Sequence, residues 1–481
     1  MTSLASAPFH EGCAVCGTHF PIDIPDELVE AAKNRDLVVF AGAGISTERP
    51  QLFPETFYEE VEARLRDEPS GKSFPEVMQE FEDAFGRREL IRAMLDRIDY
   101  VSTFQSLQSN TTAFHSEIAS ISQLNAILTT NWDDFFERFS GARPFVLDED
   151  FAFFDLPGRR VLKLHGSMSN LSSIVATTSD YTSREEDLAR SVMGAKLRDF
   201  LATKVILFVG YSLTDSDFES IYRSVIERMG RFRRHAFIVT PVDTGSAVDF
   251  GLTHLKTDGG HFAHLLKRRL EDSGHHIPDE RLDRAEWIHR AVLAAHVASE
   301  KLLENPNVFG GFTQAYQDGI LAALGRVRLM RHKGEYSDPQ QVRQTVSEYA
   351  HSFAETVADR RYFDACYVEG YMLGTRSLLL SDDELRNLPI IETFGSPIFR
   401  SKRPDPHGEV EVPWWVSRPE WTLAEFIQES NRRGGDVGDW LARAAAATRS
   451  RGGRSPGLAV EHKQILAGLR PGQVPQHSEF L

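Results

Sequence analysis

Cysteine is scarce in this sequence, with three residues among 481. Such a number does not build a disulfide framework and indicates a reducing compartment. Cys13 and Cys16 form a single CAVC pair, and Cys366 lies far from it. A zinc site made of four cysteines of this chain is therefore excluded. His10 or His19 could complete a mixed site around CAVC, but half a motif is weak support.

Long apolar runs and excess positive charge are also lacking. No stretch approaches the roughly 20 apolar residues of a membrane span. The opening MTSLASAPFHEG has no charged segment followed by an apolar one, so we expect no signal peptide and a cytoplasmic, soluble protein. The formal net charge of −16 disfavours direct nucleic-acid binding. A nuclease has little support, because no clustered metal-ligand motif stands out, and we expect no metal.

Short apolar strands alternate with helices over the first part of the chain. The predicted strands are LVVF, NAILTT, VLKLHG, VILFVG and AFIVTP. Their alternation with helices is typical of a parallel sheet. We therefore predict an α/β fold, a Rossmann-like parallel sheet with helices on both faces. Three helices are predicted in the later part of this region. They are EEDLARSVMGAKLRDFLA, a helix that begins near Asp215, and the closing helix HFAHLLKRRLED, which follows the strand AFIVTP.

The sequence changes character near residues 274 to 284. Long amphipathic helices follow without apolar strands between them, which predicts a mainly α-helical C-terminal domain. The Pro- and Gly-rich stretch FGSPIFRSKRPDPHGEVEVPWW predicts a loop, followed by a last helix pair (LAEFIQESNRR and VGDWLARAAAATRS). The expected parts are an N-terminal extension (1–24), the α/β domain (25–275), the helical domain (280–450) and a flexible tail (451–481).

Polar clusters follow four of the predicted strands. They are AGAGIS, TTNWDD, KLHGS and VGYSLTDSD. Because ligands of doubly wound sheets bind at the carboxyl ends of the strands, we expect these clusters to converge on one crevice.

The AGAGIS turn contains two glycines that allow close backbone approach to a phosphate. Gly42 and Gly44 permit a tight turn, and helix-start amides could bind a pyrophosphate. Thr47 follows Ser46 where a dinucleotide fingerprint has its third glycine, and no acidic strand end follows at the usual distance. A hydride-transfer enzyme is thus disfavoured. A turn that binds nothing is the alternative.

Two further residues suit catalysis at these strand ends. Asn131 could hold a ribose hydroxyl or a water, since an amide both donates and accepts. Alternatively, it is the N-cap of a helix opening at Trp132. His165 could act as a general base near neutral pH, or be structural. Asp215 and Asp217 are predicted caps of the next helix, which leaves Gly210 and Ser212 better placed to touch a ligand.

Taken together and in this order, the four clusters resemble those of the sirtuin (silent information regulator 2-like) family of NAD-binding proteins. The resemblance spans roughly residues 25 to 275. It implies that Gly42, Ala43, Gly44, Ile45 and Ser46 line the site for the phosphates and ribose of NAD. It further implies that Asn131 and Asp133 shape the pocket around the nicotinamide ribose and that His165 takes the position of the catalytic base. Gly210, Tyr211 and Ser212 would contact the nucleotide.

The sequence departs from the protein-deacylating sirtuins at two places. The stretch from Gly166 to Val205 has no cysteine, whereas those enzymes carry a four-cysteine zinc module there. TERPQLFPETFYEEV replaces the run G-I-P-D-F-R that usually follows the first motif. What remains resembles the zinc-module-lacking bacterial effectors of anti-phage defence. That resemblance implies an NAD+ glycohydrolase (NADase) that uses NAD as substrate and depletes it during abortive infection.

Control of such an activity is expected, because an unrestrained NADase would poison its host. The helical domain is the predicted regulatory or assembly surface, although its apolar stripes also build its own core. The resemblance implies a homo-oligomer and a protein partner such as a HerA-type ATPase, with a short Argonaute as a weaker candidate. Two other functions stay open at this point: a zinc-free NAD-dependent protein deacylase, and a non-catalytic module that binds NAD or ADP-ribose.

Overall fold

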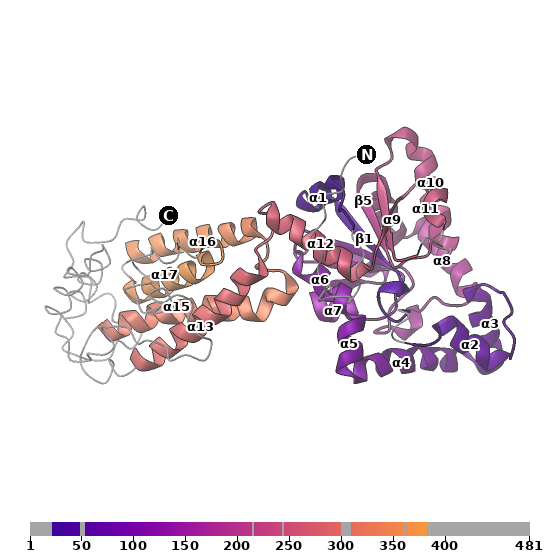
Figure 1. Ribbon diagram of the computed structural model, residues 1–481, viewed down its shortest axis with the longest axis horizontal. Helices are drawn as coiled ribbons and strands as arrows, with labels where there is room; N and C mark the ends of the chain where they lie inside the picture. The colour runs from indigo at the N-terminus through magenta and orange to yellow at the C-terminus, as the bar shows by residue number, and fades with distance from the viewer. Residues whose placement is uncertain are drawn as a thin grey trace, which may run out of the picture. The chain divides into compact units, whose positions relative to one another are not determined.

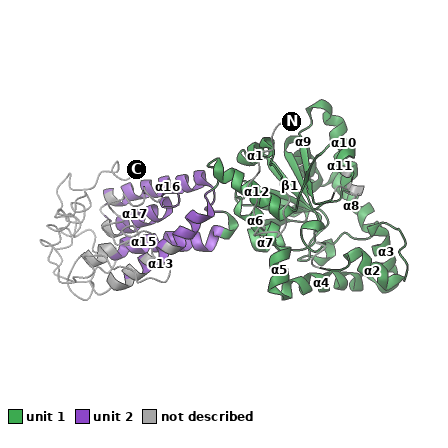
Figure 2. Ribbon diagram, in the orientation of Figure 1, with its two compact units in different colours: residues 1–276, 332–334 green, residues 277–331, 335–481 purple. Residues whose placement is uncertain are grey.

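The structure is a computed structural model that describes residues 22–48, 53–213, 216–242, 245–299, 309–359, 361–381 and 384. Contacts divide the chain into two units, Met1–His276 with His332–Gly334, and Ile277–Arg331 with Glu335–Leu481 (Figure 2). The predictions for Cys13, Cys16, His10, His19, Asp215, the last helix pair and the tail lie outside the described residues.

The first unit is built on a parallel sheet that has seven strands in the described residues. Their order is β3-β4-β2-β1-β5-β6-β7, and every pairing is parallel. All five residues of the central strand, β1, are apolar and buried, as a sheet covered on both faces requires. The strands are β1 (Leu37–Ala41), β2 (Ala126–Thr129), β3 (Arg143–Phe145), β4 (Arg160–Lys163), β5 (Val205–Val209), β6 (Ala236–Thr240) and β7 (Thr253–Lys256).

Helices cover both faces of the sheet (Figure 1). Successive strand residues point to opposite faces, so Leu37, Val39 and Ala41 join one core and Val38 and Phe40 the other. The first core also contains residues of α1 (Asp26–Lys33), α6 (Ala113–Ser120), α7 (Phe135–Ser140) and α12 (Gly259–Asp272). The second contains residues of α8 (Thr178–Arg190), α9 (Val192–Thr203), α10 (Ser216–Met229) and α11 (Ser246–Asp249). The predicted Rossmann-like α/β fold is confirmed.

Helices α2, α3 and α4, which lie between β1 and β2, form a separate small core. Phe57, Val77 and Leu90 are buried there together with Ile174 and Ala176, which lie beyond β4, and Trp132 packs against them. The insertion thus packs onto the segments that follow β2 and β4. The three helices are α2 (Phe57–Leu65), α3 (Phe74–Phe85) and α4 (Arg87–Thr103), and α5 (Gln105–Thr111) follows them before α6.

Two details of the predicted elements were wrong. The helix predicted over EEDLARSVMGAKLRDFLA is broken at Ser191, whose hydroxyl accepts the Gly194 amide at 3.1 Å and begins α9. The edge strands β3 and β7 were missed. Both strands are short and partly exposed: one of three residues is buried in β3, and one of four in β7. They therefore lack the apolar run that marks the central strands.

The second unit is helical in its described part, as predicted. Its helices are α13 (Asp279–Ser299), α15 (Phe309–Met330), α16 (Pro339–Ala358) and α17 (Tyr362–Arg376). Glycines bring α15 and α17 together: a Cβ on Gly319 would lie 2.0 Å from the Tyr367 carbonyl oxygen, and one on Gly370 would lie 1.9 Å from that of Tyr316. No helix in the described ranges is long and apolar enough to cross a bilayer.

Candidate active site at the carboxyl ends of the central strands

Four strand ends carrying the sequence motifs lie in one row. Thr129 of β2 pairs with Ala41 of β1 and with Lys163 of β4, and Ala41 also pairs with Val209 of β5. The chain runs from β1 to β2 and β4 on one side and then returns to β5 on the other. The switch between β1 and β5 is where doubly wound sheets bind ligands.

The turn after β1 and the turn after β5 are packed backbone to backbone. The Gly42 amide donates to the Val209 carbonyl at 3.0 Å, and the Gly44 amide donates to the Gly210 carbonyl at 3.0 Å. A Cβ on Gly42 would lie 2.5 Å from the Gly210 oxygen, and Gly210 has a φ of +58°. Glycine is therefore required at both turns. Ala43 and Gly44 are exposed, whereas Ile45 and Ser46 are buried.

Asn131 is held against the first turn by its side chain. Its Nδ2 donates to the Gly42 carbonyl and to Ser46 Oγ, each at 3.1 Å. Its Oδ1 is buried and has no hydrogen-bond partner. The alternative of a helix N-cap at Asn131 was wrong, since α7 begins at Phe135 and the Asn131 side chain reaches back to the first turn instead. An unpaired amide oxygen in this place is an acceptor that a ligand hydroxyl or a water can use.

Asp133 is fully enclosed behind the same turn. Its Oδ1 accepts the Phe135 amide at 3.2 Å. Burial raises the pKa of Asp133, while the nearby Lys163 ammonium and hydrogen bonds from the Phe135 amide and the Ser46 hydroxyl act in the opposite direction. Asp133 is therefore placed to hold Ser46 rather than to reach solvent.

Lys163 is a functional candidate that the sequence reasoning missed. It is 1% exposed, and its Nζ donates to the Asp133 carbonyl and forms an ion pair with Glu137 Oε1 at 3.1 Å. Burial raises the pKa of Glu137, and the Lys163 ammonium opposes that rise. The sequence did indicate this role, because Lys163 follows the buried apolar residues Val161 and Leu162 in β4. A lysine buried at such a position needs a charged or polar partner.

His165 follows β4 in the same way that Asn131 follows β2. Both stand two residues beyond a paired position, Lys163 and Thr129. His165 is 3% exposed, and its ring lies 5.0 Å from that of Tyr181 in an edge arrangement. Gly166 has a φ of +81°, and a Cβ there would lie 2.1 Å from the Ser173 oxygen. The glycine allows the chain to turn sharply after His165.

The three predicted residues after β5 differ in placement. Gly210 forms the turn against Gly44. Tyr211 is 4% exposed, and its ring packs 4.7 Å from Phe40 in the second core. Ser212 is exposed. Gly210 and Ser212 are accordingly the positions of this segment that a ligand can reach most directly.

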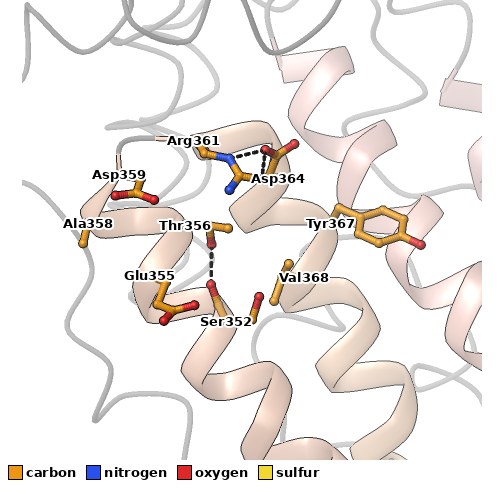
Figure 3. A pocket seen from close by; sticks show the side chains of 9 residues that line it. All are labelled: Ser352, Glu355, Thr356, Ala358, Asp359, Arg361, Asp364, Tyr367 and Val368. Atoms are coloured by element: carbon orange, nitrogen blue, oxygen red, sulfur yellow. Dashed lines mark hydrogen bonds and ion pairs between the residues drawn. The ribbon is translucent and has the colours of Figure 1, made fainter.

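No group of three or more His, Cys, Asp and Glu side chains is placed to hold a metal ion in the part of the chain that the structure describes. A polar hollow of about 620 Å³ lies in the helical unit, lined by residues of α16 and α17 such as Glu355, Arg361 and Asp364 (Figure 3). None of the candidate site residues lines it.

Residues 125–251 match the family model of the SIR2-like domain. This part of the chain is therefore similar to the SIR2-like domain. The matched segment holds Asn131, His165 and Gly210, and the fold around it has the Rossmann-like topology described above. The chain is also 26% identical over 218 residues to the NAD(+) hydrolase ThsA of Cytobacillus dafuensis. This alignment covers 44% of the present chain and 42% of that relative, so it spans less than half of either protein.

Proposed function

We propose that this chain is an NAD+ glycohydrolase. It hydrolyses the bond between nicotinamide and ribose, so that NAD+ and water give nicotinamide, ADP-ribose and a proton. The observation that carries the proposal is Asn131, whose amide nitrogen is fixed by Gly42 and Ser46 while its oxygen lacks a partner. The relative ThsA is an NAD(+) hydrolase, which supports the same substrate.

In this proposal the exposed amides around Ala43 and Gly44 receive the pyrophosphate. Asn131 Oδ1 accepts a hydrogen bond from a ribose hydroxyl or from the attacking water. Departure of nicotinamide leaves positive charge on the ribose, and His165 takes the proton from the water, directly or through a ribose hydroxyl. Asp133 and Lys163 do not contact the substrate in this proposal. They hold the segment after β2, which positions Asn131 and Ser46.

The direct test is incubation of the pure full-length chain with NAD+ alone, followed by chromatography of nicotinamide and ADP-ribose. We expect release of both products without any acylated peptide, and at least about a hundredfold loss in Asn131→Ala and His165→Ala. Asn34→Ala, at the exposed residue that follows α1, and His351→Ala, on the exposed face of α16, are matched controls and should keep wild-type rates. Release that requires an acylated peptide would instead identify a deacylase.

We also propose that the activity is restrained until a partner or self-assembly activates it during anti-phage defence. A HerA-type ATPase is the preferred partner, ahead of a short Argonaute. The test is NAD content in cells that express the chain alone, with its neighbouring genes, and as His165→Ala with those genes. Loss of NAD only in the second culture supports control by a partner. Equal NAD loss in the first two cultures would argue against restraint, and equal loss in the third would remove the catalytic assignment.

A further inference from the structure

A cationic hollow lies at the amino-terminal ends of the strands, whereas the candidate active site lies at their carboxyl ends. The hollow has a volume of about 280 Å³ and sits where β5 and β6 begin, at Val205 and Ala236. Lys204, Arg231, Arg233 and Arg234 line it. Four cations around one hollow are unexpected in a chain with a net charge of −16.

The cations of this hollow are only partly neutralised by the protein. Asp36 pairs with both Lys204, at 2.8 Å, and Arg234, so one carboxylate serves two positive charges. Arg231 and Arg233 form no ion pair with any described residue. The surplus positive charge is available to an anion.

Arg233 is positioned by backbone rather than by a carboxylate. Its Nη1 donates to the Phe250 carbonyl at 3.5 Å. Gly251, with a φ of +60°, lies directly beneath the guanidinium: a Cβ there would be 2.6 Å from Arg233 Nη2. The glycine thus leaves room for a cation that keeps its charge free.

Apart from His235, which pairs with Glu27, the remaining lining consists of glycine, apolar and aromatic residues. Ile206, Tyr222, Val225 and Phe250 contribute to it, and the rings of Tyr222 and Phe250 lie 5.7 Å apart. A flat ring could pack on these groups while an attached anion meets the arginines.

We propose that this hollow binds a small phosphate-bearing ligand with a flat ring, of the mononucleotide class. A volume near the lower end of small-molecule sites favours such a ligand over a macromolecule, which needs about 800 Å² of surface on each partner. The site is separate from the one proposed for NAD+ because the two lie at opposite ends of the strands. This proposal is therefore independent of the hydrolase assignment.

Calorimetric titration of the full-length chain with uridine monophosphate tests the proposal, with uridine and inorganic phosphate as part-ligands. We expect the monophosphate to bind more tightly than either part and to lose affinity as salt is added. The double variant Arg231→Glu with Arg233→Glu should weaken it at least about tenfold, since two attractions become repulsions. Arg228→Glu, an exposed arginine of α10 that does not line the hollow, is the matched control and should bind as the wild type does.

Asn131→Ala separates this hollow from the NAD+ site, because it should leave binding of the monophosphate unchanged. The proposal is overturned if uridine binds as tightly as its monophosphate, or if the double variant keeps wild-type affinity. It is equally overturned if Arg228→Glu weakens binding as much as the double variant, since the effect would then be one of overall charge.

Discussion

The Nδ2 atom of Asn131 lies 3.1 Å from the carbonyl oxygen of Gly42 and thereby ties the segment after β2 to the turn after β1. The same nitrogen reaches Ser46, which in turn is hydrogen-bonded to Asp133. The AGAGIS and TTNWDD motifs, each weak when taken singly, are joined by this one amide. The opposite atom, Oδ1, is buried and has no hydrogen-bond partner.

Gly42→Ala should destabilise the α/β unit although φ at Gly42 is −111° and suits any residue. The added Cβ would meet the Gly210 oxygen and the Tyr211 Cα, which are backbone atoms that cannot swing aside. We expect a loss of about 1–3 kcal/mol, measured as a lower midpoint of thermal unfolding. Gly325→Ala, the same change on α15 with no atom closer than 3.8 Å, should leave the midpoint equal or higher. An unchanged midpoint for Gly42→Ala would mean that the two turns are not packed as described.

Lys163→Met should destabilise the protein by about 3–5 kcal/mol, because it leaves the Asp133 carbonyl and the Glu137 carboxylate buried without their cation. Denaturant unfolding measures the loss. Adding Glu137→Gln should recover part of it by removing the unpaired charge. Lys196→Met breaks a pair with Asp199 whose side chains are 29% and 49% exposed, so it should cost no more than about 1 kcal/mol. Equal costs for the two lysines would contradict the buried network.

Glu369 on α17 should make the stability of the helical unit fall as pH rises. The carboxyl is 2% exposed, and neither oxygen has a hydrogen-bond partner in the described residues. Burial raises the pKa of Glu369 from 4.5 to about 8. Because the folded state holds this proton more tightly than the unfolded state, the contribution of Glu369 to stability is fully present below pH 4.5 and is lost progressively up to about pH 8.

Glu369→Gln removes the titrating proton and should flatten this dependence. Denaturant unfolding of the full chain at several pH values across that window measures it. Glu348→Gln, on the exposed face of α16, is the control and should keep the wild-type slope. A variant that loses stability with pH as steeply as the wild type would rule out Glu369 as the group responsible.

The parallel sheet was predictable because its central strands are apolar runs of a kind that only a doubly covered sheet can bury. β1 and β5 illustrate this, since all their residues are buried. The edge strand β7 was not predictable in this way, because its sequence THLK has no apolar run and only one of its four residues is buried. The break between α8 and α9 depends on a single cap at Ser191 within a continuous helical pattern.

The positions of the site residues followed from topology, whereas their contacts did not. The carboxyl ends of parallel strands lie on the same side of the sheet. Asn131 and His165, which each follow such an end, could therefore be placed on one side from the sequence. That Asn131 reaches back to Gly42 rather than capping the next helix depends on the conformation of three residues before α7. The pairing of Lys163 with Glu137 required the register of β4 against β2 and the start of α7.

The sheet order also bears on how the protein is made. β1 is the first strand synthesised, yet one of its two neighbours, β5, is added only after β2, β3 and β4. The glycine turn after β1 is closed by the Gly210 carbonyl, which belongs to that late strand. A nascent chain that has not yet produced β5 therefore lacks the backbone partners that close the turn after β1. If the site consumes NAD+, the ribosome-bound fragment is harmless to the cell until most of the α/β unit has emerged.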